Sequence, residues 1–361
     1  MYKTLLVGTG GIARQHVKSV NSLSDRVQLV AAMDIDGEKL AAFCKTYNIP
    51  RHYTDLDTAL AEEAPDFVII ASPPYVHAEQ IIKSMEAGSC VLCEKPMVAS
   101  LAEFDAITKA EERTGRYAAS VFQQRFGAGA VHLKKLTESG ELGRPLVVVC
   151  QTTWYRGQDY YDVPWRGKWD TEVGGTTVIH GIHTIDMTLD ILGPWREIRA
   201  VKGTLDRDIE VDDVMMAIVT LESGAMMSII NSALSPRQET RVRIDYQRVT
   251  AEVDYLYAHQ SKDWRYTLPD GSPDTELLAA WSHIRDNPMP VWDMQLSAFL
   301  DALDKGERPP ISGDDVRPTI EFIAALYKAG LTGQTVKRGE IGPGDPFYTA
   351  MSGVSAKPKE V

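Results

Sequence analysis

The sequence predicts two domains of different classes, an α/β domain followed by an α+β domain. Over residues 1 to about 122, short apolar runs alternate with helical stretches, which is typical of a doubly wound parallel sheet. A glycine-rich loop, Gly8 to Ala13, joins the first apolar run to the first helical stretch. After about residue 145, strand-like runs follow one another without helices between them, which indicates an antiparallel sheet.

Strands and helices alternate throughout the first half. The strands are expected at 3–7, 28–33, 67–71, 90–93 and 117–121, and the helices near 11–23, 37–47, 55–63, 76–87 and 100–114. Ligands of such sheets bind at the carboxyl ends of the strands. We therefore expect Gly8, Asp34, Ser72 and Glu94 along one edge of the sheet.

For the second half, the sequence predicts a sheet with a few helices. A connecting helix is expected from Arg125 to Gly140, and further helices at 178–192, 294–303 and 316–331. The expected strands are 145–152, 198–203, 214–221, 226–234, 241–246 and 248–255. The expected domain limits are 1–123 and 124–341, with a tail at 342–361 that is rich in Gly, Pro and Lys.

Composition excludes several classes of protein. The net charge of −12 over 361 residues argues against a nucleic-acid or anionic-membrane partner. No run of about 18 apolar residues suggests a membrane span, and the chain opens on a strand rather than a signal peptide. The four cysteines are too sparse for a secreted scaffold and favour a reducing cytoplasm. Cys90 and Cys93 form a C-x-x-C in an apolar run, where core packing is the simpler interpretation than zinc or redox chemistry.

The glycine loop is typical of dinucleotide binding. In the spacing G-x-G-x-x-A, Gly8 allows the tight turn, Gly10 lets a pyrophosphate approach, and Ala13 keeps helix and strand close. The cofactor-binding residues expected here are Gly8, Thr9, Gly10, Gly11 and Ile12. Asp34 ends the second strand, where a carboxylate would bond a ribose 2′-hydroxyl and repel a 2′-phosphate, so NAD is favoured over NADP. The alternative is an ordinary glycine turn with Asp34 capping a helix.

Two further strand ends carry polar residues. Ser72 and Pro73 follow the third long strand, and His77 begins the next helix; we expect this loop along the nicotinamide half of a cofactor. A plain proline turn is the alternative. Glu94 and Lys95 follow the fourth long strand, where Glu94 can accept hydrogen bonds and Lys95 would project toward the ring. An exposed ion pair is the alternative for these two.

An aromatic-rich segment lies between the halves. Aromatic faces beside hydroxyl and guanidinium groups suit a sugar or cyclitol ring. The expected substrate contacts are Trp154, Tyr155, Arg156, Tyr161, Trp165 and Arg166. The alternative is a long loop that its own aromatic side chains hold down.

A histidine-rich segment follows a glycine pair, Gly174 and Gly175. His180, His183 and Asp186 are spaced by three and roughly share a helical face. A metal site would lack an obvious fourth ligand, so no metal is expected. An imidazole at a hydride-transfer site is the sharper interpretation, and a buried histidine held by a carboxylate is the alternative.

Together these motifs resemble the glucose-fructose oxidoreductase / inositol dehydrogenase / MocA family over nearly the whole chain. The resemblance rests on Gly8 to Ala13, Ser72-Pro73-Pro74 with His77, Glu94-Lys95-Pro96, Gly174-Gly175, Gly181-Ile182-His183-Thr184-Ile185-Asp186, Gln295 to Ala302, and Pro310-Ile311-Ser312-Gly313-Asp314. It implies a Rossmann domain followed by an α+β domain whose open, mainly antiparallel sheet forms a homodimer or homotetramer. It also implies that Lys95 and His183 flank the reacting carbon. One position departs from the inositol dehydrogenase-like pattern, because Ile179 stands where an Asp precedes the motif histidine by four residues.

Our working hypothesis is an NAD-dependent oxidoreductase acting on a secondary hydroxyl of a sugar, glycoside or cyclitol. His183 would take the hydroxyl proton, Lys95 would bond the same oxygen, Asp186 would orient His183, and His180 would contact substrate. The alternatives are an NADPH-dependent sugar carbonyl reductase, which Asp34 disfavours, and a catalytically silent dinucleotide sensor, which Ile179 favours. In the sheet, Met215, Ala217, Val219, Met227 and Ile229 alternate like a face that a second copy buries, or one that the chain's own helices bury.

Overall fold

The structure is a computed structural model that describes residues 1–354 and contains two compact units. The first unit comprises residues 1–121 and 292–317, and the second comprises 122–291 and the residues from 318 onward. The domain limits expected from the sequence stay a prediction. Residues 292–317, which the sequence assigned to the second domain, pack with the first unit. The expected tail includes a short helix, α13 (Pro346–Thr349), and its last residues, 355–361, lie outside the described part.

The first unit is built on a six-stranded parallel sheet with the order β3-β2-β1-β4-β5-β6. This is the Rossmann-type order, which confirms the predicted fold class. β3 was not predicted, because its three residues at the sheet edge are polar or aromatic rather than an apolar run. The strands are β1 (Tyr2–Val7), β2 (Val27–Met33), β3 (Arg51–Tyr53), β4 (Phe67–Ile70), β5 (Cys90–Cys93) and β6 (Ala118–Ser120).

Helices follow the strands as expected, and one helix from late in the chain joins them. Leu296, Phe299 and Leu300 of α11 are buried in the same core as Phe67 of β4, with the two phenyl ring centroids 5.2 Å apart. The helices of this unit are α1 (Ala13–Ser22), α2 (Gly37–Tyr47), α3 (Leu56–Glu63), η1 (Pro74–Val76), α4 (His77–Glu86), α5 (Leu101–Thr114), α11 (Val291–Lys305) and η5 (Gly313–Asp315).

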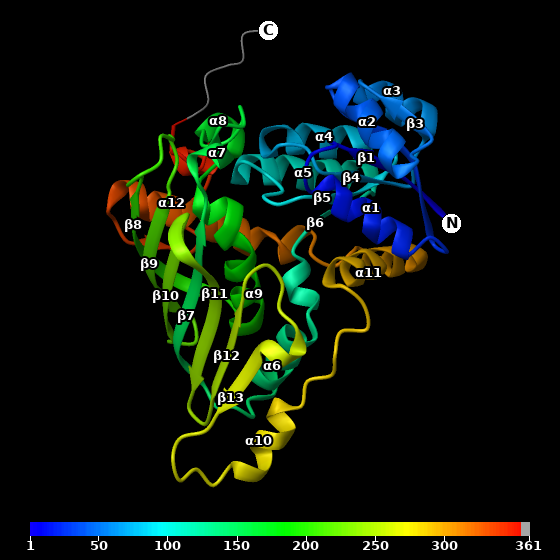
Figure 1. Ribbon diagram of the computed structural model, residues 1–361. Helices are drawn as coiled ribbons and strands as arrows, with labels where there is room; N and C mark the ends of the chain where they lie inside the picture. The colour runs from blue at the N-terminus through cyan, green and yellow to red at the C-terminus, as the bar shows by residue number, and fades with distance from the viewer. Residues whose placement is uncertain (355–361) are drawn as a thin grey trace. The chain divides into compact units, whose positions relative to one another are not determined.

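The second unit is built on an eight-stranded sheet with the order β13-β12-β11-β7-β10-β9-β8-β14 (Figure 1). All neighbouring pairs are antiparallel except β7 and β10, so the sheet is mixed and mainly antiparallel. The short edge strands β13 and β14 were not predicted. The strands are β7 (Pro145–Tyr155), β8 (Trp195–Gly203), β9 (Val214–Leu221), β10 (Met226–Ser232), β11 (Leu234–Tyr246), β12 (Thr250–Tyr255), β13 (Trp264–Thr267) and β14 (Val336–Lys337).

Helices of the second unit cover one face of this sheet. Figure 1 shows α9 and α12 beside the strands, and a Cβ added at Gly330 of α12 would lie 3.4 Å from the Met215 sulfur of β9. The helices are η2 (Gln123–Phe126), α6 (Ala128–Ser139), α7 (Gln158–Tyr161), α8 (Trp169–Glu172), η3 (Thr177–Gly181), α9 (Ile182–Leu192), η4 (Ser261–Asp263), α10 (Thr275–Ser282) and α12 (Arg317–Thr332). Among the described residues, no helix is both long and apolar enough to cross a membrane.

The alternating apolar side chains of β9 and β10 are buried by the chain itself. Met215, Ala217, Val219, Met227 and Ile229 are at most 6% exposed, so of the two interpretations the one in which the chain itself buries this face is confirmed. Their neighbours along β9 and β10 point to the opposite face. There Met216, Ile218 and Met226 are each at least half exposed.

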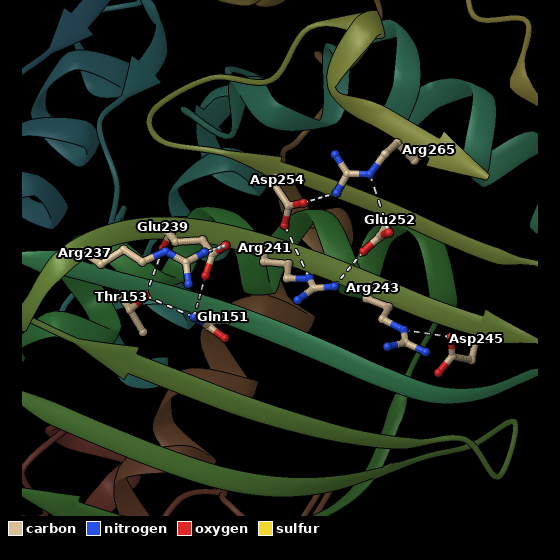
Figure 2. Close-up of polar contacts among 10 residues, drawn as sticks. All are labelled: Gln151, Thr153, Arg237, Glu239, Arg241, Arg243, Asp245, Glu252, Asp254 and Arg265. Atoms are coloured by element: carbon tan, nitrogen blue, oxygen red, sulfur yellow. Dashed lines mark hydrogen bonds and ion pairs between the residues drawn. The ribbon is translucent and has the colours of Figure 1, made fainter. Parts of the chain in front are cut away.

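The outward face of the sheet has a second, charged part (Figure 2). Arg241 of β11 contacts Glu252 and Asp254 of β12, at 2.7 and 3.4 Å. Arg265 of β13 pairs with the same two carboxylates. Two further ion pairs lie within β11, Arg237 with Glu239 and Arg243 with Asp245. The charged half of this face is thus neutralised within the chain, whereas the apolar half is open.

Candidate active-site elements of the two units

The glycine loop lies at the carboxyl end of β1. Gly8 has a φ of +90°, and a Cβ there would lie 2.7 Å from the carbonyl carbon of Ala71, so glycine is required on both counts. Added Cβ atoms at Gly10 and Gly11 would have no protein atom within 4 Å. The loop therefore packs tightly against β4 at its start and is open at its tip. Ile12 is partly exposed beside this tip, at the start of α1.

Asp34 is fixed directly to the glycine loop. One of its carboxylate oxygens accepts hydrogen bonds from the backbone N–H and the hydroxyl of Thr9, both at 2.7 Å. The other accepts the Asp36 N–H at 3.1 Å, and Lys39 lies 3.4 Å from the first. Burial alone would raise the pKa of Asp34, but the bonds from Thr9 and Asp36 and the charge of Lys39 together lower it. The carboxylate is therefore held as an anion beside the open loop.

His77 lies beneath the Ser72-Pro73 loop. The side chain is fully buried, and its ring nitrogens lie 2.8 Å from the carbonyl oxygens of Ser72 and Pro96. Burial lowers the pKa of His77, although the two carbonyl contacts and nearby Glu94 oppose this effect. His77 thus joins the loops after β4 and β5, while Ser72 and Pro73 keep partial exposure above it.

Glu94 and Lys95 have different environments. Glu94 is 5% exposed, and its carboxylate lies 2.9 Å from Nε2 of His16 on α1 and accepts the Lys95 N–H at 3.2 Å. Lys95 is the one residue of 90–98 that is not buried. Sequence reasoning missed His16, because it lies 78 residues from Glu94 and has no motif of its own.

The histidine-rich segment forms a π-helical turn, η3, that continues into α9. Within residues 177–189, Ile179 and His183 keep partial exposure and the others are buried. Below the turn, the buried Asp212 accepts the N–H groups of Gly175 and Thr177 at 3.0 and 3.2 Å. It also accepts the hydroxyl of Tyr327 at 2.8 Å. Four bonded groups, counting the Thr177 hydroxyl, thus fix the glycine turn that leads to His183.

Asp186 forms a buried ion pair with Arg125. Its carboxylate is fully buried and accepts both Nε and a terminal N–H of Arg125, at 2.7 and 2.6 Å, and the Thr319 hydroxyl at 2.8 Å. These bonds hold the carboxylate to Arg125 and Thr319, and the expectation that Asp186 orients the His183 imidazole stays a prediction. Burial raises the pKa of Asp186, against the lowering effect of Arg125 and Thr319.

Several of the predicted substrate residues meet around His180. The Trp154 and Tyr160 rings lie 4.9 and 5.9 Å from the His180 ring, between centroids. Arg156 stacks over Trp154, and Arg166 stacks over Tyr160 at 3.9 Å. We call these five residues together with Tyr257, which contacts Trp154, the His180 cluster.

The other predicted substrate residues lie around or outside this cluster. Trp165 lies under Arg166, with the guanidinium 4.3 Å from its ring centroid, and Tyr161 contacts Tyr160 edge to face. Tyr155 contacts Arg207 instead and is 46% exposed. No group of three or more His, Cys, Asp or Glu side chains in residues 1–354 is placed to hold a metal ion.

The C-x-x-C pair belongs to the core of the first unit. Cys90 and Cys93 are both buried in β5. Burial raises the pKa of both thiols, which disfavours the reactive thiolate.

Comparisons with known proteins agree with this arrangement. The family described as "Oxidoreductase family, NAD-binding Rossmann fold" matches residues 2–122, and the GFO/IDH/MocA C-terminal domain matches 130–252. A D-apiose dehydrogenase from Paraburkholderia graminis is 25% identical, covering 97% of this chain and 93% of its own. A glucose-6-phosphate 3-dehydrogenase from Bacillus subtilis is 27% identical over 80% of this chain and 83% of its own.

A solved structure shares the same fold. The WlbA dehydrogenase from Chromobacterium violaceum, in complex with NADH and UDP-GlcNAcA, has a TM-score of 0.83 and 26% identity. The match covers 94% of this chain and 97% of the WlbA chain. The chain therefore belongs to the GFO/IDH/MocA family of NAD-binding oxidoreductases, and its named relatives include sugar and polyol dehydrogenases.

Proposed function

We propose that this protein transfers hydride between NAD and a secondary hydroxyl of a sugar, glycoside or cyclitol, with Lys95 and His183 at the reacting oxygen. The observation that carries the proposal is a shared property of these two side chains. Each is an open position in an otherwise buried stretch, Lys95 within 90–98 and His183, with Ile179, within 177–189. A polar, titratable side chain that keeps partial exposure within a buried segment can reach a bound ligand.

The first unit would hold the cofactor. Gly10 and Gly11 leave space for a pyrophosphate at the start of α1, where the first N–H groups of the helix favour an anion. Asp34 would accept hydrogen bonds from the ribose hydroxyls of NAD, and its contacts with Thr9 and Lys39 hold the carboxylate in position. When bound, NAD supplies the hydride acceptor.

The proton steps belong to side chains of this chain. His183 would take the hydroxyl proton as the substrate is oxidised, and Lys95, as an ammonium group, would bond the same oxygen as negative charge grows on it. Because Ile179 offers no carboxylate, this pair would carry the proton without an aspartate base. The aromatic residues Trp154, Trp165 and Tyr161 would contact the sugar ring with His180.

The test is the absorbance of reduced nicotinamide with NAD or NADP across a panel of sugars, glycosides and inositols. Lys95→Ala and His183→Ala should each lower kcat by about 10²–10⁴-fold, roughly 3–5 kcal/mol of barrier. Lys45→Ala, an exposed lysine on α2, is the matched control. Near-normal kcat in both variants would refute the assignment.

The two rivals make different predictions in the same assay. A carbonyl reductase would prefer NADPH, against the charge of Asp34. A silent sensor would bind NADH but turn over no substrate of the panel, and Ile179 would then be its leading explanation. In that case Ile179→Asp is the variant to test for recovered turnover.

The oligomer that we propose is a homodimer or homotetramer that covers the open sheet. On the outward face Val201, Met216, Ile218 and Met226 are 50–73% exposed, next to the neutralised charges of Figure 2. Exposed apolar side chains gathered on one sheet face favour burial against another protein surface. Sedimentation at micromolar concentration should give a dimer or tetramer, and Ile218→Glu should shift it toward monomer. A monomer in the unmodified protein would refute this part.

A further inference from the structure

The His180 cluster contains one arginine whose charge is not neutralised. Arg166 pairs with the buried carboxylate of Glu172 at 2.9 Å. Arg156 donates to the Tyr155 carbonyl at 2.7 Å, the Gln238 side-chain oxygen at 3.3 Å and the Tyr257 hydroxyl at 3.2 Å. All of these acceptors are neutral.

This environment sets Arg156 apart within the second unit. The other described arginines of the unit that lack a carboxylate partner, which are Arg144, Arg196, Arg285 and Arg338, are all exposed. Arg156 is half-buried, and its guanidinium carbon lies 4.9 and 5.5 Å from the ring centroids of Trp154 and Tyr160. A partly desolvated cation without a counter-charge favours an anion at that place.

The neighbouring titratable groups do not supply that anion. Burial raises the pKa of Tyr160 to about 12, against the lowering effect of Arg166, so its hydroxyl stays neutral. Glu172 is already engaged by Arg166 and by the Gly167 N–H at 2.6 Å. The two guanidinium groups and the Glu172 carboxylate leave a net charge of +1, counted without His180.

We propose that Arg156 binds an anionic substituent, a carboxylate or a phosphate, on the substrate of this enzyme. The inference rests on the proposed function and narrows its substrate class to acidic sugars or polyols. The planar guanidinium fork suits both groups, since each offers two oxygens for paired N–H bonds. Trp154, whose ring contacts both Arg156 and His180, would then lie against the ring that bears the acidic group.

The experiment compares matched acidic and neutral substrates with NAD. D-glucuronate and D-glucose form the carboxylate pair, and D-glucose 6-phosphate and D-glucose form the phosphate pair. The readout is the ratio of kcat/KM within each pair, acidic over neutral. We expect at least one ratio above 1 in the unmodified protein, and an Arg156→Met variant should lower it about 10- to 100-fold. Arg156→Lys keeps the charge but loses the planar guanidinium fork, so its ratio should lie between those of the unmodified protein and Arg156→Met.

The control is Arg237→Met, because Arg237 is 84% exposed on β11 and lies outside the His180 cluster. It should leave both ratios unchanged. If Arg156→Met lowers acidic and neutral substrates alike, or the unmodified protein prefers the neutral members, the inference is overturned. The arm in which the ratio falls identifies the group as carboxylate or phosphate.

Binding separates a failure of this inference from a failure of the proposed function. If no member is turned over, the same sugars are titrated calorimetrically into the NADH complex. If an acidic sugar binds more tightly than its neutral counterpart, and Arg156→Met loses this difference, the anion site is supported. The absence of turnover then counts against the proposed function alone. Binding without charge preference, or no binding of any member, overturns the inference.

Discussion

His259 couples the stability of the second unit to acid. The ring is 2% exposed, accepts the Trp264 indole N–H at Nδ1 (3.2 Å) and places Nε2 3.3 Å from the Gln124 carbonyl oxygen. Because Nδ1 is the acceptor, the neutral ring carries its proton on Nε2 and donates it to that carbonyl. Protonation would place a second N–H against the indole N–H. Burial accordingly lowers the pKa of His259 from 6.5 to about 4.

The sign and size of the effect follow from this pKa. Below pH 6.5, His259 is protonated in the unfolded chain but stays neutral in the folded chain. The contribution of the neutral ring to the unfolding free energy is therefore fully present above pH 6.5 and is lost as the pH falls toward 4. At 1.36 kcal/mol per pKa unit, the loss is about 1 kcal/mol by pH 5.5 and about 3 kcal/mol by pH 4. Carboxylates titrate over part of the same range, so the quantity to measure is a difference between variants.

The assay is urea unfolding between pH 7 and pH 4.5, followed by circular dichroism. His259→Gln keeps an acceptor and a donor but has no proton to gain, so its unfolding free energy should fall less steeply with acid than that of the unmodified protein. His283→Gln removes an exposed histidine and should follow the unmodified protein. Parallel pH profiles for His259→Gln and the unmodified protein would refute the argument.

Three further predictions concern the glycine loop and Asp34, which is bonded to it. Gly8→Ala should lower the unfolding free energy, measured by urea unfolding, by at least ~2 kcal/mol. The alanine would have to adopt a positive φ, and its Cβ would lie 2.7 Å from the Ala71 backbone. Gly10→Ala should leave stability within ~1 kcal/mol and weaken NADH binding by fluorescence titration; equal effects of the two would contradict the assignment of Gly10 to the pyrophosphate. Asp34→Asn keeps an acceptor for Thr9 and removes the charge, so the ratio of kcat/KM for NADP over NAD should rise ~10-fold or more. An unchanged ratio would show that the Asp34 charge does not select the cofactor.

The fold was largely readable from the sequence because its strands differ so clearly from their surroundings. The inner strands β4 and β5 are fully buried and appear as unbroken apolar runs between turns that contain glycine or proline. The edge strands β3 and β13 lack such runs, since an edge strand needs less apolar cover, and both were missed. For the apolar face of β9 the sequence left two interpretations open, because alternation alone does not say whether the chain's own helices or a second copy bury that face.

The contacts that support the candidate residues could not be predicted in this way. His16 and Glu94 are 78 residues apart, Arg125 and Asp186 are 61 apart, and Tyr327 and Asp212 are 115 apart. Each contact joins polar residues that are far apart in the sequence and come together only in the folded chain. A single sequence offers several equivalent partners for a carboxylate, and the choice depends on packing.

The two carboxylates closest in sequence to the proposed proton-handling residues have one physical role in common. Glu94 precedes Lys95 directly, and Asp186 follows His183 by three residues, so both look like members of a catalytic pair. Both are buried, and a buried carboxylate costs several kcal/mol unless a partner compensates it. That partner is His16 for Glu94 and Arg125 for Asp186, each on another element of the same unit. The compensated carboxylates thereby tie the segments that carry Lys95 and His183 to the cores beneath them. At these two positions, a carboxylate that is close in sequence to a candidate proton-handling side chain therefore has a structural role, since it is buried and already paired.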